Sequence, residues 1–169
     1  MNAAELDRLI RRDGCLAARF LGVYPRDKLP QPTTIPLSPP VTLIVNHDTA
    51  GSPGTHWSAM YVDAAEKIGC YFDPWGAPPL APFASFLDAL TRRNWVYNNK
   101  RLQSFISTTC GQFCLVFIWH KCRGYSFAHI LNMFEDSQVV NDRLVVRFVT
   151  EHYGMRTNVV DKDFLGGLY

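Results

Sequence analysis

The chain has 169 residues and a formal net charge of +2, and 47% of its residues are hydrophobic. This length and composition predict one globular domain with a sizeable core and exclude a disordered chain. No apolar run approaches the roughly 20 residues that a membrane-spanning helix needs, so no membrane partner is expected. Charges interrupt residues 1–12, which therefore do not resemble a secretory signal. The small positive charge permits contact with nucleic acid but does not require it.

Residues 2–12 have the apolar spacing of a helix, with Asn2 placed to cap its start and Gly14 to end it. Residues 25–40 contain six of the eleven prolines and predict an extended surface connection. The short apolar run that follows, residues 41–46, predicts a strand.

Residues 55–63 and 69–73 predict two strands that are joined by a polar turn. In such a hairpin the start of the first strand faces the end of the second. His56 and Asp73 are therefore expected to meet at the same end of the sheet.

The second half of the chain predicts mostly helices. Residues 110–122 are apolar nearly all round, which indicates a helix buried in the centre. The other expected elements are helices at 82–93, 126–135 and 141–152 and short strands at 95–97 and 101–104. Together they predict a single α+β domain over residues 1–154, in which a mixed, mostly antiparallel sheet packs against helices. Residues 155–169 have little pattern and are expected to form a tail.

The five cysteines are an odd number and include no CxxC pair, which disfavours a zinc ribbon or a redox motif. Their spread indicates reduced thiols in a cytosolic or nuclear setting, and no bound metal is expected. Three or four of them are expected to be buried thiols that pack as small hydrophobic side chains. The cysteines are Cys15, Cys70, Cys110, Cys114 and Cys122.

Cys110 is the candidate nucleophile because it begins the expected buried helix. A thiol attacks as the thiolate, and the free N–H groups and partial positive charge at a helix N-terminus favour that anion. His56 is the candidate base for the thiol proton, and Asp73 can hold the imidazole in one tautomer. Gln103, seven residues before the cysteine, can donate a hydrogen bond to the developing oxyanion.

Each of these residues also has an ordinary structural interpretation. Cys110 fits a core thiol, His56 fits a buried or surface histidine, and Asp73 fits the first position of a turn. A lone Gln103 is usually a surface side chain. From the residues alone, both interpretations stay open.

Two neighbours of these residues are candidates for a substrate cleft. Gly111 has no side chain and would let a substrate carbonyl approach the backbone. Trp57 follows the candidate base and can wall the cleft, although it and Trp75 also fit core aromatics.

Segments spread over most of residues 3–153 resemble adenain, the adenovirus-type cysteine endopeptidase, and the related proteases that remove SUMO-like tags. The spacing from histidine to acid and from glutamine to cysteine is similar to that of the family. The segments are residues 13–15 with 20–24, residues 54–57, residues 70–76, residues 103–114 and the pattern of residues 141–153.

The resemblance implies that His56 is the base, Asp73 the residue that orients it, and Cys110 the nucleophile. It further implies that Gln103 and the backbone N–H of Cys110 form the oxyanion hole. Adenain of mammalian viruses often has Glu at the position of Asp73, and both acids can accept the imidazole N–H. A larger departure is the segment between Gly76 and Gln103, which is short here.

That short segment includes surface where an activating peptide docks in the family, in some members through a disulfide. No cysteine lies between Cys70 and Cys110, so a disulfide-linked peptide is not expected. The chemistry needs no cofactor, and activation by a peptide or by DNA stays open. At the other end, residues 164–168 resemble the family's preferred cleavage pattern. Gly166 and Gly167 are therefore a candidate self-cleavage site, with a chance glycine-rich end as the alternative.

Three functions are compatible with the sequence. The leading hypothesis is a viral cysteine endopeptidase that cleaves capsid and core precursors at small Gly-containing sites, in the host nucleus and in the virion. The second keeps the chemistry and removes SUMO- or ubiquitin-like tags that end in Gly-Gly. The third is a non-catalytic capsid or nucleic-acid-binding protein on the same fold.

Overall fold

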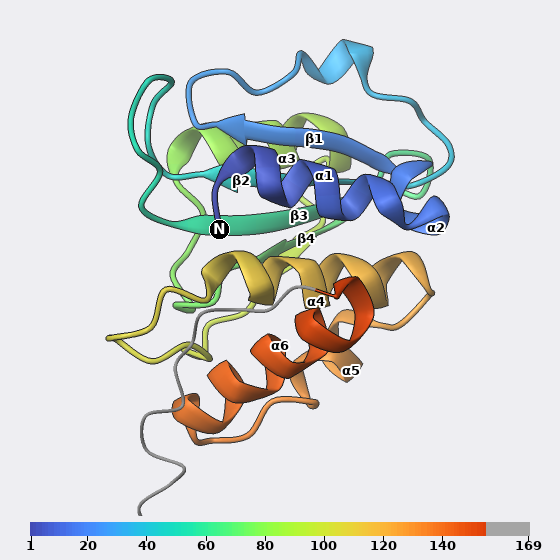
Figure 1. Ribbon diagram of the computed structural model, residues 1–169. Helices are drawn as coiled ribbons and strands as arrows, with labels where there is room; N and C mark the ends of the chain where they lie inside the picture. Colours follow the sequence, from blue (N-terminus) through green and yellow to red (C-terminus); the bar gives the residue numbers. More distant parts are fainter. Residues whose placement is uncertain (155–169) are drawn as a thin grey trace, which may run out of the picture.

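The computed structural model describes residues 1–154, which fold around a five-stranded mixed sheet (Figure 1). The sheet order follows the chain, and the strands are β1 (Phe20–Pro25), β2 (Val41–Asn46), β3 (Trp57–Asp63), β4 (Ile68–Phe72) and β5 (Trp95–Tyr97). The three central strands are antiparallel, and each edge strand runs parallel to its neighbour. The predicted α+β class is confirmed.

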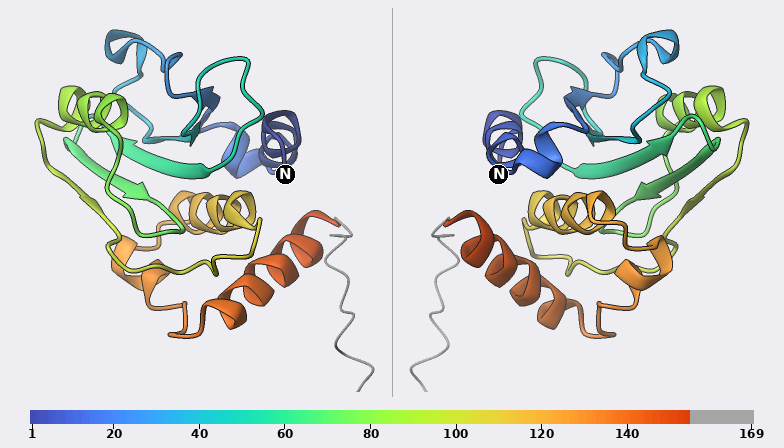
Figure 2. Two further views of the ribbon diagram at one scale, coloured as in Figure 1. Left: turned by 90° about the vertical axis from the view of Figure 1, so that its left-hand side faces the viewer. Right: turned by 90° about the vertical axis from the view of Figure 1, so that its right-hand side faces the viewer.

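Helices cover both faces of this sheet (Figures 1 and 2). One face packs against α3, and the other packs against α1 and α4, with α5 and α6 on the outer side of α4. The helices are α1 (Ala3–Arg12), α2 (Gly14–Ala17), α3 (Ala81–Thr91), α4 (Cys110–Cys122), α5 (Phe127–Leu131) and α6 (Gln138–Tyr153), with the short 3-10 helix η1 (Pro32–Thr34). Among residues 1–154, no helix has the length and apolar character needed to cross a bilayer.

Side chains of the central strands alternate between two hydrophobic cores, as the period of a strand requires. Ile44 and Phe72 belong to the core that contains α1 and α4. Met60 and Tyr71 belong to the core on the α3 side. Because α4 lies between the sheet and α6, it is buried on nearly every side, as its all-round apolar pattern predicts.

Two local predictions are wrong for identifiable reasons. The first helix ends at Arg12 as predicted, but Gly14 begins α2 instead of capping α1, because the Asp13 side chain accepts hydrogen bonds from the N–H groups of Cys15 and Leu16 and caps a new turn. Residues 101–104 form no strand, because the N–H groups of Leu102 and Gln103 both donate to the carbonyl of Pro74.

Other elements differ in extent. The helix expected at 126–135 ends at Leu131, and the last helix begins at Gln138 rather than Asn141. The Asn141 side chain is fully buried and bonds both backbone groups of Glu135, so this asparagine ties α6 to the segment that connects the two helices. The predicted tail and the candidate cleavage residues Gly166 and Gly167 lie outside the described residues.

The turn after β4 is held from two sides. Asn98 is buried, accepts a hydrogen bond from the Asp73 N–H at 2.8 Å, and donates to the Asp73 carbonyl at 2.6 Å. Gly76 closes the turn with φ +71°, and a Cβ there would lie 2.6 Å from the Lys100 backbone. Only glycine fits this close approach. The backbone of Asp73 is therefore fixed before its side chain makes any contact.

Replacing Asn98 with alanine should leave the Asp73 N–H unpaired in the core and remove one of the two donors to the Asp73 carbonyl, which keeps the Gly76 N–H. We expect Asn98→Ala to lower the free energy of unfolding by roughly 1–3 kcal/mol, measured by urea denaturation. The neighbouring Asn99 is exposed, so Asn99→Ala should stay within about 0.5 kcal/mol of wild type. Equal stabilities of the two variants would show that Asn98 does not support the turn.

Candidate active site

His56 and Asp73 meet at the end of the central hairpin, as the spacing predicts. His56 directly precedes β3 and Asp73 directly follows β4. The imidazole Nε2 lies 2.8 Å from Asp73 Oδ1, and the side chains are 2% and 0% exposed. Because a carboxylate only accepts, Nε2 carries the proton of this hydrogen bond. The second ring nitrogen, Nδ1, is buried and has no hydrogen-bond partner among the described residues.

Asp73 fits both interpretations that the sequence leaves open. Its Oδ1 also accepts the Trp75 N–H at 2.7 Å, which is the bond expected of an aspartate that begins a turn. Its Oδ2 has no hydrogen-bond partner among the described residues. The same carboxylate therefore closes the turn and holds the imidazole of His56.

The environment of His56 favours its charged form. Burial lowers the pKa of the imidazole, but the hydrogen bond with Asp73 and the interaction with the Cys110 thiol more than offset this effect and raise the pKa to about 9. Thiol and imidazole thus interact, although Nδ1 makes no hydrogen bond of ordinary geometry. A proton transferred from sulfur to this ring would be retained at neutral pH.

His47 is a member of the site that sequence reasoning did not select. Its backbone N–H donates to the His56 carbonyl, and its Nε2 lies 2.9 Å from Ser58 Oγ and 3.0 Å from the Tyr71 hydroxyl. Burial, and then the neighbouring His56, lower the pKa of His47 to about 4. His47 is therefore neutral at pH 7. A sequence signal existed, because antiparallel pairing of β2 and β3 places the residue after β2 beside the residue before β3.

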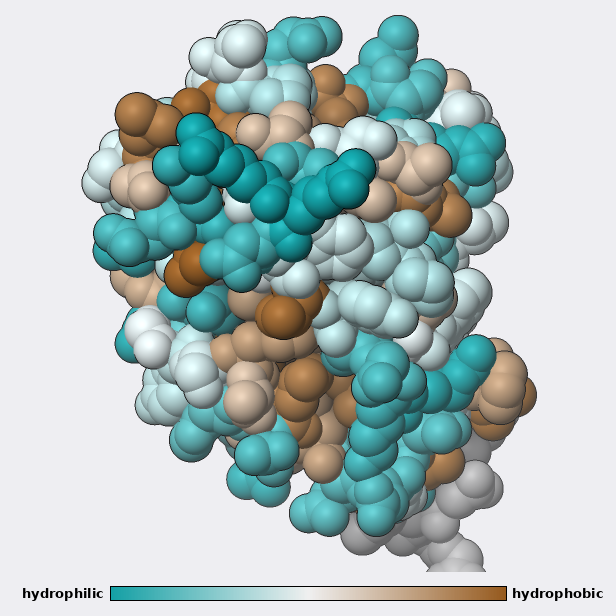
Figure 3. All heavy atoms as spheres, turned by 180° about the vertical axis from the view of Figure 1, so that it is seen from behind, coloured by the Kyte–Doolittle hydropathy of each residue, from teal (hydrophilic) through white to brown (hydrophobic). Residues whose placement is uncertain are grey.

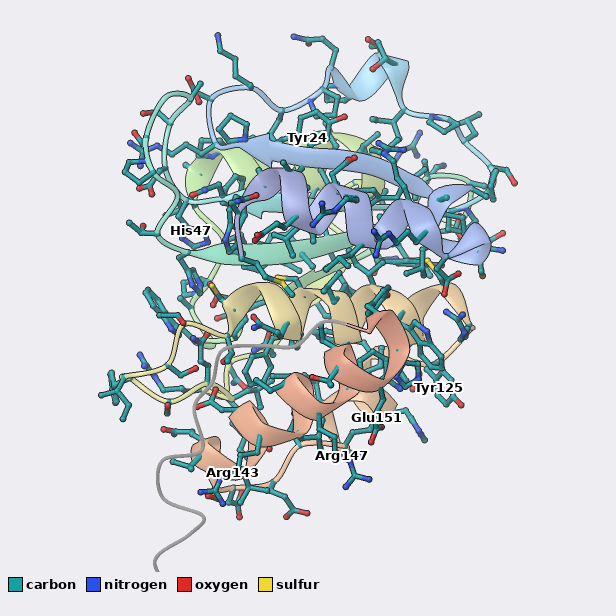
Figure 4. All side chains as sticks on the ribbon, in the orientation of Figure 1. Tyr24, His47, Tyr125, Arg143, Arg147 and Glu151 are labelled. Carbon is teal, nitrogen blue, oxygen red and sulfur yellow. The ribbon has the colours of Figure 1, made fainter. Side chains whose placement is uncertain are left out.

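Two aromatic contacts fix the plane of the candidate base. The indole of Trp75 stacks on His56 with ring centroids 3.8 Å apart, and His47 meets the same ring edge-on at 4.6 Å. Figure 4 places His47 at the end of the sheet near the start of α4. The imidazole can therefore neither rotate nor tilt without losing packing.

Trp57 has a different place from Trp75. It is 5% exposed and donates its indole N–H to the Met1 carbonyl at 3.2 Å. It lines a cavity of about 410 Å³ between the start of α1 and residues 49–53. Trp75 is thus the tryptophan that covers the imidazole, and Trp57 faces the cavity beside α1.

The ligand atoms of His47, His56 and Asp73 all lie within 4.8 Å of one another, which is a spacing compatible with a metal ion. However, His56 and Asp73 already bond each other directly, and both are buried. These side chains therefore suit a hydrogen bond between imidazole and carboxylate better than the binding of a metal ion.

Cys110 is the first residue of α4 and is 7% exposed. The preceding residue, Thr109, supplies no side-chain cap. As at any helix start, the N–H groups of the first turn have no intrahelical partner, and here Thr109 does not cap them either. Their partial positive charge favours a thiolate at this position.

The assignment of Gly111 to the substrate cleft is wrong. A Cβ at Gly111 would lie 3.2 Å from both the Leu6 side chain and the Met1 Cβ. The missing side chain therefore lets α1 pack against the start of α4. Gly111 is a packing residue of the core rather than a surface for a substrate carbonyl.

Gln103 is 1% exposed and joins the candidate site through two bonds. Its backbone N–H donates to Pro74 in the turn of Asp73, and its side-chain Nε2 donates to the Ser107 carbonyl at 2.8 Å. Nε2 also lies 3.5 Å from Ser107 Oγ, a long contact that a hydrogen bond to a nearby anion can replace. The buried amide therefore has a fixed direction, as a preorganised donor requires.

Asp142 at the start of α6 fixes the loop that leads to Cys110. Its carboxylate accepts hydrogen bonds from the Ser107 hydroxyl at 2.9 Å, the Thr109 hydroxyl at 2.7 Å and the Ser104 N–H at 3.3 Å. One carboxylate thus holds both ends of the loop. Sequence reasoning could not find this residue, because nothing in the pattern joins positions so far apart.

No family model matches the chain. A protein of Acanthamoeba polyphaga mimivirus described as "Putative thiol protease R355" is 30% identical over 109 residues, which cover 60% of this chain and 36% of that protein. The chain therefore spans about a third of the length of this relative. The shared part does not by itself assign the activity of the whole relative.

Two crystal structures of the ASFV pS273R protease are similar in fold. Their TM-scores are 0.62 and 0.63 at 15% identity, and they cover 85% and 93% of this chain and 65% and 68% of the pS273R chain. At this level of identity the likeness shows the fold alone. The α+β domain described above is thus the fold of a viral protease.

The raised pKa of His56 is expected to depend on Asp73. In Asp73→Asn the imidazole loses its anionic partner, so its pKa should fall well below about 9. NMR titration of the ring resonances would measure this, with the His56 signal identified by its loss in His56→Gln. The surface variant Asp7→Asn is the matched control. An unchanged pKa in Asp73→Asn would contradict the assigned pairing.

Proposed function

We propose that this chain is a cysteine endopeptidase in which Cys110 attacks a peptide carbonyl and forms an acyl-enzyme. The observation that carries the proposal is the buried 2.8 Å hydrogen bond between His56 and Asp73, beside a thiol at the start of α4. The fold of a viral protease and the likeness to a viral protein described as a thiol protease support it.

In the acylation step, Nδ1 of His56 accepts the proton of the Cys110 thiol, and the thiolate attacks the carbonyl carbon. The carbonyl oxygen becomes an anion that accepts hydrogen bonds from the Cys110 N–H and a side-chain N–H of Gln103. The imidazolium, which Asp73 stabilises, then gives its proton to the leaving amine as the C–N bond breaks. A thioester and a free amine result.

In the second step, His56 removes a proton from water as the water attacks the thioester. The C–S bond breaks, the acid product leaves, and the proton returns to the sulfur of Cys110. Neutral His47 places no second positive charge against the imidazolium that forms twice in this cycle. The neutral form of His47 therefore supports the charge change that the reaction requires.

For the substrate, we propose viral capsid or core precursors that are cut at small Gly-containing sites in the host nucleus and the virion. The support is the likeness to two viral proteins and the resemblance of the site segments to adenain. Removal of Gly-Gly tags would use the same residues, so substrate identity separates the two functions. Activation by a peptide or by DNA is part of the same proposal and is tested by adding each to the assay.

Loss of the nucleophile should abolish turnover. We expect Cys110→Ala to lower hydrolysis of Gly-containing peptides by at least about a thousandfold, whereas Cys15→Ala, at an exposed thiol, should match wild type. Assays with Gly-Gly tag conjugates, run in parallel, identify the preferred substrate. Equal turnover by Cys110→Ala and wild type would refute the proposal.

Thiol labelling checks the same residue without a substrate. Burial raises the pKa of Cys70 and Cys114, and it raises the pKa of Cys122 to about 11, so these thiols should react slowly with iodoacetamide. Cys110 should be labelled ahead of them. Binding to capsid protein or nucleic acid without this reactivity would instead support the non-catalytic alternative.

The oxyanion hole and its support should be separable by kinetics. We expect Gln103→Ala to lower kcat by about a hundredfold or more, since it removes a donor to the oxyanion.

Asp142→Ala should lower kcat by about tenfold with little change in KM, because the loop loses its anchor. Asp142→Asn should restore part of the lost kcat, because its amide oxygen can still accept hydrogen bonds from the loop. The exposed neighbour Arg143, labelled in Figure 4, gives the control Arg143→Ala. A purely structural role for Asp142 would change stability but not kcat.

A further inference from the structure

The loop of residues 101–109 (yellow in Figure 1) projects from the body of the molecule. It carries two exposed hydrophobic side chains. Phe105 is 80% exposed and Ile106 is 93% exposed, more than any other large hydrophobic residue among the described ones. In the rear view of Figure 3, hydrophobic surface gathers on a small projection at the right-hand edge, the side where this loop lies. Such exposure next to a catalytic cysteine needs an explanation.

Looseness of the loop does not explain it. The base of the loop is tied to α6 through Asp142, which bonds Ser104, Ser107 and Thr109. Inside the loop, Gln103 bonds the Ser107 carbonyl. The two hydrophobic side chains are therefore held on a fixed loop. A partner that binds them does not have to order the loop, so binding avoids that entropic cost.

Arg101 extends this surface toward the candidate base. Its guanidinium lies 3.7 Å from the ring centroid of Phe105 and 5.9 Å from that of Trp75. Trp75 in turn stacks on His56. A continuous ledge, defined here as Trp75, Arg101, Phe105 and Ile106, thus runs from the imidazole to the tip of the loop.

The charge of the ledge is not neutralised within the chain. Arg101 makes no ion pair with any residue in the part of the chain that the structure describes, whereas the adjacent Lys100 pairs with Asp136. A guanidinium stacked on aromatic rings keeps its N–H edge free for a carboxylate. One uncompensated cation between apolar side chains fits a peptide that carries a single acid.

The mechanism gives the direction of that peptide. His56 must hand its proton to the leaving amine, so the amine nitrogen lies at the imidazole when the peptide bond breaks. The residues that follow the scissile bond therefore leave the site past His56 and the Trp75 that covers it. The ledge begins at that point.

We propose that the ledge binds the substrate segment that follows the scissile bond and selects an apolar side chain next to an acidic one, whose carboxylate pairs with Arg101. This inference rests on the proposed endopeptidase function. Nucleic acid fits less well, because a strand of phosphates calls for a row of free cations. The ledge offers one cation, and Asp136 and Asp142 lie on the neighbouring segment.

The kinetic test uses peptides with one acyl-side sequence and different leaving-side residues, namely Leu-Asp, Leu-Asn and Ser-Asn. A reporter with the same acyl side and a fluorogenic amide has no leaving-side residues. Wild type should prefer the Leu-Asp peptide over Leu-Asn by about fivefold to tenfold in kcat/KM, and Arg101→Gln should abolish this preference. Phe105→Ser with Ile106→Ser should lower kcat/KM for the Leu-containing peptides only.

The reporter separates the two proposals. All of these variants should cleave it at the wild-type rate, as should the control Arg143→Gln. A preference that persists in Arg101→Gln, or an equal loss on the reporter, would overturn the role of the ledge while leaving the endopeptidase function intact.

A binding experiment tests the proposal even if no peptide is cleaved. Fluorescence anisotropy of labelled leaving-side peptides against Cys110→Ala measures the ledge without turnover. The Leu-Asp peptide should bind several-fold more tightly than Leu-Asn, and adding Arg101→Gln should remove the difference. Equal binding of both peptides, or Arg101-dependent binding of a single-stranded oligonucleotide in their place, would overturn the inference.

Discussion

The hydrogen bond between His56 and Asp73 is the constraint on which the rest of the site depends. It joins the residue before β3 to the residue after β4, so the central hairpin must be in register for it to form. Asn98 fixes the backbone of Asp73, and Trp75 fixes the plane of His56. The turn that contains Asp73 and Trp75, held in place by Asn98, therefore immobilises the base before any substrate arrives, which is the preorganisation that catalysis needs.

His47 and His56 are in edge-on contact, and their pKa values show that the hydrogen-bond partner decides which imidazole is charged. The pKa of His56 is raised to about 9 and that of His47 is lowered to about 4, although desolvation disfavours the charged form of both. The difference lies in the partner, because His56 bonds a carboxylate whereas His47 bonds the hydroxyls of Ser58 and Tyr71. Once the thiol proton has moved to this pair, the positive charge therefore lies on His56, the ring that interacts with Cys110, and not on His47.

The sequence predicts those parts of the site that depend on local pattern. The pairing of two strands in a hairpin was enough to bring His56 and Asp73 together, and the all-round apolar run was enough to place Cys110 at the start of a buried helix. The same logic, applied to β2 and β3, would have added His47. Each of these inferences uses only spacing within one element or between adjacent strands.

The remaining parts depend on contacts between distant segments, which spacing does not encode. Asp142 reaches a loop more than thirty residues away, and Asn98 reaches the backbone of Asp73 across a helix. For Gly111 the sequence led to a wrong prediction, because its position next to Cys110 suggested that it lines a substrate cleft. What decides its role is the packing of Met1 and Leu6 from the far end of the chain.

The loop between Gln103 and Cys110 links the chemistry to the choice of substrate. Its buried side contains the amide of Gln103, and its exposed side contains Phe105 and Ile106. Because Asp142 anchors both, the loop cannot adapt to a leaving segment without moving the donor to the oxyanion. A segment that fits the ledge would leave the donor in place, whereas one that pushes the loop outward would weaken the stabilisation of the transition state. Selectivity in such a site therefore acts on kcat as well as on binding.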